Sequence, residues 1–170
     1  GPSNEELQRI LTIAARTPDH GKLTPWRFVI VPPEQRPALA QLLARALPEH
    51  DPGANQAHHA KALEFAHQAP VMIVLISAPI EGHKIPVWEQ QLSCGAVAMN
   101  LLHGAHALGY VGGWITGWAA YSERVRQAFC GDGERIAGFI FLGTAGQELE
   151  ERPRPDLATL VRDWQRPKNI

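Results

Sequence analysis

Apolar side chains repeat every three or four positions in several stretches of the chain, the spacing that buries one face of a helix. The longest stretch is Val87–Leu108, where small residues leave room for close packing and Gly109 is a natural end. At the start of the chain, Ser3 and Glu6 have the spacing of a capping box. The pattern predicts helices from Ser3 to the residue before Pro18, and over Glu34–Leu47, Ala54–Gln68, Val87–Leu108, Ser122–Phe129 and Leu157–Trp164.

Three shorter apolar runs predict strands: Trp26–Val31, Val71–Ser77 and Arg135–Leu142. The second is apolar almost throughout, as in a strand buried on both faces. Pro48–Gly53, Ala78–Pro86 and the glycine-rich run Gly112–Gly117 are expected to be turns or loops. Helices and strands are mixed without a strict βαβ repeat or a linker, so the sequence predicts one α+β domain over residues 1–170.

Composition narrows the class of protein. The chain has 170 residues, 45% of them hydrophobic and 19% charged, with a net charge of −1, as in a globular protein with no nucleic-acid or anionic-membrane partner. The first six residues lack the basic and apolar regions of a signal peptide. Two cysteines, Cys94 and Cys130, form no disulfide framework. We therefore expect a cytoplasmic protein without a membrane span.

Several common chemistries have no motif in this sequence. The histidine pairs His58–His59 and His103–His106 lack the spacing or the additional ligands of a metal site, so we predict no metal. No serine lies in a G-x-S-x-G motif, and neither a P-loop nor a G-x-G-x-x-G motif is present.

The segment Arg16–Phe28 concentrates hydrogen-bond donors. Four of them lie within eight residues: His20, Lys22, Thr24 and Arg27. A reduced flavin carries negative charge near N1 and its C2 carbonyl, where donors stabilise it. Loops also carry such residues for turn formation alone, and both interpretations stay open.

Four glycines lie within the nine residues Gly109–Gly117. Glycines let a backbone approach a flat ring closely and leave its N–H groups accessible. They also occur in ordinary bulges and turns, so the run taken by itself leaves both interpretations open.

Five stretches in this order resemble the nitroreductase family, in particular its short members. They are P-D-H-x-x-x-x-P-W-R-F at Pro18–Phe28, I-P-x-W-E-Q at Ile85–Gln90, the run Gly112–Gly117, Phe139–Thr144, and R-P-R-P at Arg152–Pro155. The similarity spans Glu5 to Val161. It implies an α+β fold with a mixed β-sheet flanked by helices and a long central helix.

The resemblance also implies a function: an FMN-dependent oxidoreductase that passes hydride from NADH or NADPH to a small electrophile such as a nitroaromatic or a quinone. It implies a homodimer with FMN at the interface. The implied cofactor-binding residues are His20 and Thr24 at the flavin, from one subunit or from both, Trp114, Ile115 and Thr116 along the ring, and Arg152 and Arg154 at the phosphate. No side chain is assigned as catalytic, because water or the flavin environment can supply protons.

The chain departs from the family at one point. Members usually begin with a basic motif that holds the FMN phosphate, and Gly1–Asn4 contains no counterpart. This departure supports an alternative function, a flavin-binding module that stores, senses or delivers flavin without nicotinamide turnover. For Arg152 and Arg154 the alternative is a solvated tail.

Overall fold

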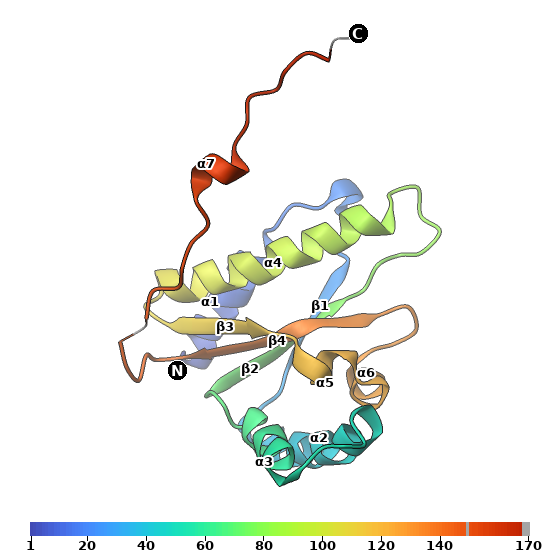
Figure 1. Ribbon diagram of the computed structural model, residues 1–170, viewed down its shortest axis with the longest axis vertical. Coiled ribbons are helices and arrows are strands. Elements are labelled where there is room, and N and C mark those ends of the chain that lie inside the picture. The colour runs from blue at the N-terminus through green and yellow to red at the C-terminus, as the bar shows by residue number, and fades with distance from the viewer. Residues whose placement is uncertain (149, 168–170) are drawn as a thin grey trace.

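Four strands form one sheet in the computed structural model, which describes residues 1–148 and 150–167. They are β1 Trp26–Ile30, β2 Val71–Ser77, β3 Val111–Ile115 and β4 Arg135–Gly143, in the order β1-β2-β4-β3 (Figure 1). Every pairing is antiparallel, where a mixed sheet was expected. The reason is that β4 lies between β2 and β3, which run in the same direction and are joined through a helix, and so makes both contacts antiparallel.

Helices cover both faces of this sheet (Figure 1). On one face lie α1 Asn4–Ala15 and the long helix α4 Val87–Ala107. On the other face lie α2 Arg36–His50, α3 Gln56–Phe65, α5 Gly117–Tyr121 and α6 Glu123–Phe129. Short 3-10 turns, η1 His20–Lys22 and η2 Pro33–Gln35, precede β1 and α2, and α7 Leu157–Leu160 lies in the C-terminal tail. The predicted α+β class with a long central helix is confirmed.

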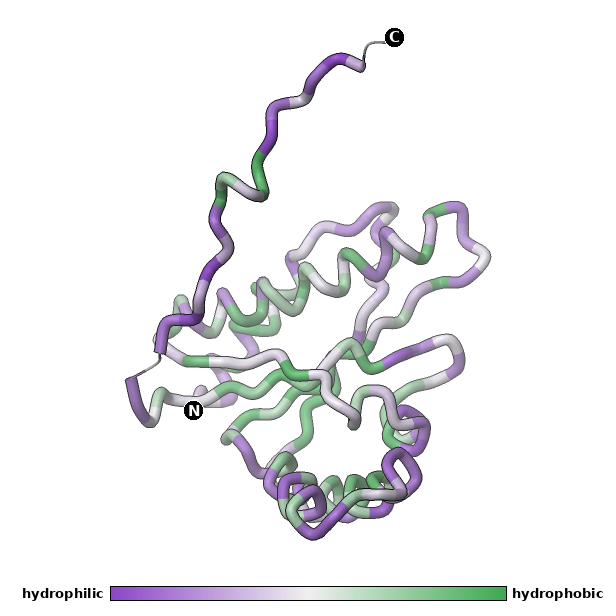
Figure 2. Tube along the Cα trace, in the orientation of Figure 1, coloured by the Kyte–Doolittle hydropathy of each residue, from purple (hydrophilic) through white to green (hydrophobic). Residues whose placement is uncertain are grey.

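The hydrophobic core follows the sheet, as Figure 2 shows by the green strands. Residues 72–76 of β2 are completely buried, because helices lie on both sides of that strand. The capping box at Ser3 is present, with the Glu6 amide donating to Ser3 Oγ over 3.3 Å. Among the described residues, no helix is long and apolar enough to cross a membrane.

The structure corrects several predicted boundaries. The glycine-rich run is not a loop, because residues 111–115 form the edge strand β3. Helix α2 continues through Pro48 to His50, since a proline in the last turn disrupts few hydrogen bonds. Helix α3 is shorter at both ends than Ala54–Gln68, and α5 was not predicted.

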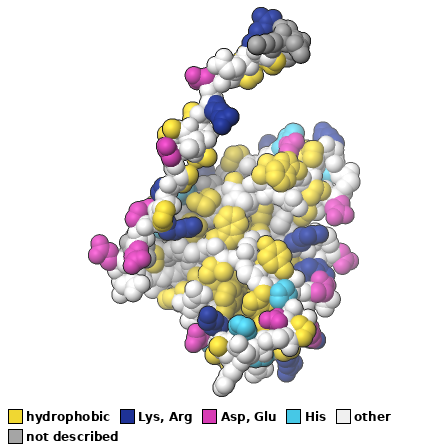
Figure 3. All heavy atoms as spheres, in the orientation of Figure 1, with side chains coloured by type: hydrophobic (Ala, Val, Ile, Leu, Met, Phe, Trp, Pro, Cys, Tyr) yellow, Lys and Arg dark blue, Asp and Glu magenta, His cyan; other side chains and the backbone are white. Residues whose placement is uncertain are grey.

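One side of α4 is left uncovered. Trp88, Leu92 and Met99 are 67%, 53% and 43% exposed, and their spacing places them on one side of the helix. Trp114 of β3, 39% exposed, adjoins them because its indole lies 3.9 Å from a Cβ built on Gly95. Figure 3 shows hydrophobic side chains gathered on this face, over α4 and the sheet.

The C-terminal tail leaves the domain after β4 and extends away from it (Figure 1). Its apolar side chains are exposed: Leu157, Leu160, Val161 and Trp164 are each at least 61% accessible. The predicted helical stretch Leu157–Trp164 is limited to the single turn α7.

Candidate functional site

The loop between α1 and β1 is fixed at both ends. At its start, the Asn100 side chain of α4 donates to Thr17 Oγ1 over 2.6 Å, and Thr17 is buried. Further along, the Thr24 amide donates to Asp19 Oδ2 over 2.7 Å. Between these contacts the backbone adopts left-handed conformations at Gly21, Lys22 and Thr24, with φ of 81°, 56° and 49°. Such conformations are uncommon for a lysine and rare for a β-branched threonine.

His20 is held by the first turn of α4. Its Nδ1 lies 2.7 Å from Glu89 Oε2, while the side chain as a whole is 65% exposed. The neighbouring Gly21 packs on Ile85, and a Cβ built on Gly21 would lie 2.3 Å from Ile85 Cδ1. Buried Gln90 in turn donates to the Ile85 carbonyl over 3.0 Å. The predicted flavin contacts His20 and Thr24 therefore lie on one ordered loop against α4.

The other predicted flavin residues lie where β3 ends. The indole of Trp114 packs over Gly138, where a Cβ would come 2.1 Å from Nε1, and Nε1 donates to the Ala137 carbonyl over 3.0 Å. Ile115 is half-buried and packs on the core cluster beneath α5. Thr116 precedes α5, and the chain turns at Gly117 with φ of 57°.

This strand end fits a flat, polar-edged ring such as that of a flavin. A Cβ built on Gly113 or on Gly117 would meet no atom within 4 Å, so the backbone is open to a planar group. Because β3 pairs only with β4, the peptide groups along its other edge are accessible to a ligand. Gly112 is different: a Cβ there would come 2.8 Å from the side chains of Leu102 and Leu142.

Within one chain the two groups of residues lie on opposite sides of the sheet. The loop holding His20 leads into β1 at one edge, whereas Trp114 lies on β3 at the other. Three strand spacings separate these edges, about 14 Å. The structure therefore does not bring His20 and Thr24 into contact with Trp114–Thr116 in a single chain.

Arg152 and Arg154 lie on the exposed tail. Arg154 pairs with Glu151 in the same segment, and neither arginine contacts the two groups described above. The tail follows β4, whose last residue, Gly143, pairs with Val111 at the start of β3. Both arginines thus follow the β3 side of the sheet, at the end away from Thr116.

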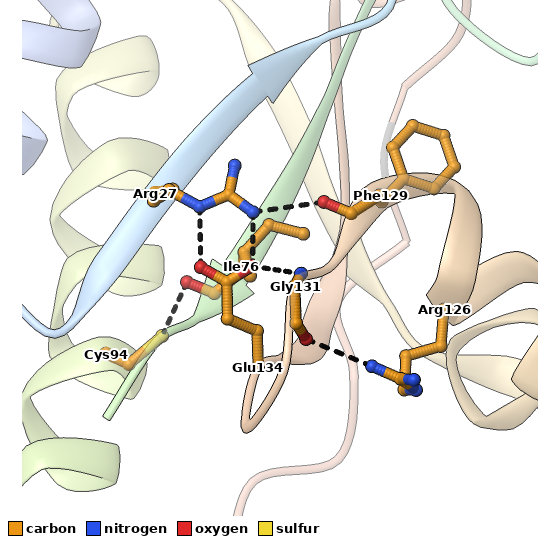
Figure 4. A network of polar contacts seen from close by, with 7 residues as sticks. All are labelled: Arg27, Ile76, Cys94, Arg126, Phe129, Gly131 and Glu134. Atoms are coloured by element: carbon orange, nitrogen blue, oxygen red, sulfur yellow. Dashed lines mark hydrogen bonds and ion pairs between the residues drawn. The ribbon is translucent and has the colours of Figure 1, made fainter. Parts of the chain in front are cut away.

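Arg27, a candidate donor in the sequence, has a different role. Its guanidinium pairs with Glu134 and donates to the Phe129 carbonyl over 3.0 Å, and Glu134 accepts from the Gly131 amide over 2.6 Å (Figure 4). The hydrogen bond from Arg27 lowers the pKa of Glu134 to about 2. This network ties β1 to the turn before β4, so Arg27 holds the fold rather than a ligand.

Cys94 is also visible in Figure 4, with Sγ 3.9 Å from the Ile76 carbonyl oxygen. Burial raises the pKa of its thiol to about 11, which disfavours the nucleophilic thiolate. No group of three metal-ligating side chains occurs in residues 1–148 and 150–167.

Sequence analysis did not single out the residues that hold the predicted site residues: Asp19, Glu89 and Gln90. Asp19 carries a weak signal, because aspartate commonly accepts from backbone amides in turns. The other two belong to a helix distant in sequence, and the periodicity of α4 does not reveal which loop its first turn contacts.

Comparisons with known proteins agree with this architecture. The family model described as the nitroreductase family matches residues 2–144. A Haemophilus influenzae protein named "Putative NAD(P)H nitroreductase" is 38% identical over 154 residues, covering 89% of this chain and 82% of that protein. The crystal structure of a nitroreductase-like family protein from Bacillus cereus superposes with a TM-score of 0.79 at 18% identity, covering 96% of this chain and 86% of that one.

A second similar structure is the FMN and NADPH-dependent nitroreductase NfnB from Sphigopyxis sp. strain HMH. It superposes with a TM-score of 0.71 at 22% identity, covering 97% of this chain and 91% of that one. At these identities the solved structures establish the fold.

Proposed function

The chain belongs to the nitroreductase family, and on that premise we propose that it is an FMN-dependent enzyme that passes hydride from NADH or NADPH to a small electrophile such as a nitroaromatic or a quinone. NfnB, similar in fold, carries FMN and NADPH dependence in its name. When bound, the flavin supplies the hydride chemistry, and the protein binds, orients and shields it.

The observation that carries this proposal is the open backbone where β3 ends. Gly113 and Gly117 leave space for a planar ring, and the backbone of Trp114–Thr116 offers hydrogen-bonding groups at its polar edge. A flavin N5 accepts a hydrogen bond readily from a backbone amide, so this position requires no acidic side chain.

His20 and Thr24 are proposed to reach the flavin from a second copy of the chain. The separation of about 14 Å between the sheet edges argues against one chain supplying both groups. A homodimer would also cover the apolar side of α4, formed by Trp88, Leu92 and Met99. The exposed apolar side chains of the tail support the same conclusion, since isolated tails rarely carry so many of them.

Arg152 and Arg154 are proposed to hold the FMN phosphate. They follow the start of β3, five residues from the proposed ring position, about 17 Å along the strand. Guanidinium groups bind phosphate oxygens through paired hydrogen bonds, and Arg152 is exposed and so accessible to such a ligand.

An equilibrium titration tests the proposal. The flavin fluorescence of FMN is followed as purified protein is added, with riboflavin, which lacks the phosphate, as the comparison ligand. We expect saturable binding with one FMN per chain and weaker binding of riboflavin. If neither ligand binds, the proposed function is wrong.

A further inference from the structure

Two carboxylates outside the predicted binding set contact the loop that carries His20 and Thr24. Asp19 Oδ2 accepts from the Thr24 amide over 2.7 Å, and Glu89 Oε2 lies 2.7 Å from His20 Nδ1. These contacts come from different elements, the loop itself and α4, and each fixes one of the two proposed flavin-binding residues.

The conformation that Asp19 holds is unfavourable by itself. Thr24 is β-branched, and its φ of 49° lies in a region that such residues rarely occupy. It also precedes Pro25, and a residue before proline normally adopts extended backbone. Strained backbone persists only where surrounding contacts enforce it, and it concentrates at functional sites. Here the enforcing contacts are the Asp19 hydrogen bond and the 2.7 Å bond from the Trp26 amide to the Thr24 carbonyl.

Glu89 determines which atom of His20 is available. Because Nδ1 faces the carboxylate, only Nε2 is left to meet a ligand, and the orientation of the ring is fixed. The glutamate belongs to the first turn of α4, whose position the buried side chain of Gln90 secures through the 78–86 loop.

We propose that Asp19 and Glu89 are positioning residues, which hold Thr24 and His20 in the geometry that binds FMN before FMN arrives. This inference rests on the proposed function. It assigns the two carboxylates no contact with the cofactor, and it explains why an unfavourable backbone conformation is maintained in this loop.

Binding measurements test the proposal with two variants and one control. Asp19→Ala and Glu89→Ala should each raise the Kd for FMN roughly tenfold or more, the effect of losing a hydrogen bond to a charged group. Glu49→Ala removes a comparable exposed carboxylate, paired with Arg124, and should leave the Kd unchanged. Unfolding midpoints should stay within about 2 °C of wild type, because relief of strain offsets the lost contact. A large fall in the midpoint would assign the carboxylates to stability instead.

A double-mutant cycle isolates the role of Asp19. Glycine adopts positive φ freely, so in a Thr24→Gly background Asp19→Ala should change the Kd less than about twofold. An equal effect in both backgrounds would overturn the proposal, because Asp19 would then act by another route.

A measurement without FMN distinguishes the two proposals. Trypsin cleavage after exposed Lys22 should be several-fold faster in Asp19→Ala than in wild type, and mass spectrometry identifies the cut. Equal cleavage rates, or wild-type FMN affinity in Asp19→Ala, would overturn this inference and leave the proposed function standing. Failure of the wild-type protein to bind FMN would overturn both.

Discussion

The indole of Trp114 occupies the space that a side chain at Gly138 would need. A Cβ on Gly138 would lie 2.1 Å from Nε1 and 2.4 Å from Cδ1 of the indole. The same Nε1 donates to the Ala137 carbonyl over 3.0 Å, so the ring is fixed on β4 at two adjacent residues. The absence of a side chain at Gly138 thus determines where the proposed ring site has its wall.

Gly138→Ala should displace this indole. The added methyl group meets a rigid ring, and overpacking of this kind costs about 1–3 kcal/mol of folding free energy. We expect a corresponding loss in urea unfolding and a Kd for FMN about tenfold higher. Gly146→Ala is the matched control, since a Cβ there meets no atom within 4 Å, and wild-type affinity in Gly138→Ala would contradict the assignment of Trp114.

Gly113→Val separates binding from folding. A Cβ at this position enters open space, and valine favours strand conformation, so unfolding should be unchanged within about 0.5 kcal/mol. If a flat ring lies against this backbone, the isopropyl group obstructs it and FMN affinity should fall at least about tenfold. Fluorescence titration measures the change, and unaltered binding would place the ring elsewhere.

Leu92→Glu should weaken the proposed homodimer. The side chain is 53% exposed on the apolar side of α4, and burying a charge there against a second copy is unfavourable. Light scattering after size-exclusion chromatography should show a shift toward monomer. Leu63→Glu, a similarly exposed leucine on α3, should stay dimeric. A wild-type protein that is monomeric at all concentrations contradicts the dimer.

Acid should weaken the link between Arg27 and Glu134. Because hydrogen bonding to Arg27 lowers the pKa of Glu134 from 4.5 to about 2, the unfolded chain binds a proton that the folded chain does not over this range. The stability from Glu134 is present above the unfolded pKa and is lost as the pH falls through the folded one. Unfolding free energy measured at about pH 5 and about pH 3 should therefore fall more in wild type than in Glu134→Gln. Equal falls would contradict the pair.

Local patterns were sufficient to predict much of the fold. The apolar run of β2 and the periodicity of α4 determine their own elements, because each buries a face that the sequence shows directly. The strand β3 could not be predicted in this way, since glycine is a poor strand former. It is held by pairing with β4, and Gly112 is required there because a Cβ would collide with Leu102 and Leu142.

The candidate site shows the same division. His20 and Thr24 could be chosen from a short donor-rich segment, but their contacts to Asp19 and Glu89 depend on loop conformation and on a helix about 70 residues away. Arg27 was a reasonable candidate donor whose partner, Glu134, is distant in sequence, so its structural role emerged only from the fold.

The most direct test of the proposed oxidoreductase is the anaerobic reaction of its FMN-loaded form with NADPH and with NADH, followed by flavin absorbance. We predict that at least one nucleotide bleaches the flavin rapidly, and that adding a quinone or a nitroaromatic compound restores the colour. A protein that binds FMN but is bleached by neither nucleotide would contradict this account and identify a passive flavin-binding module.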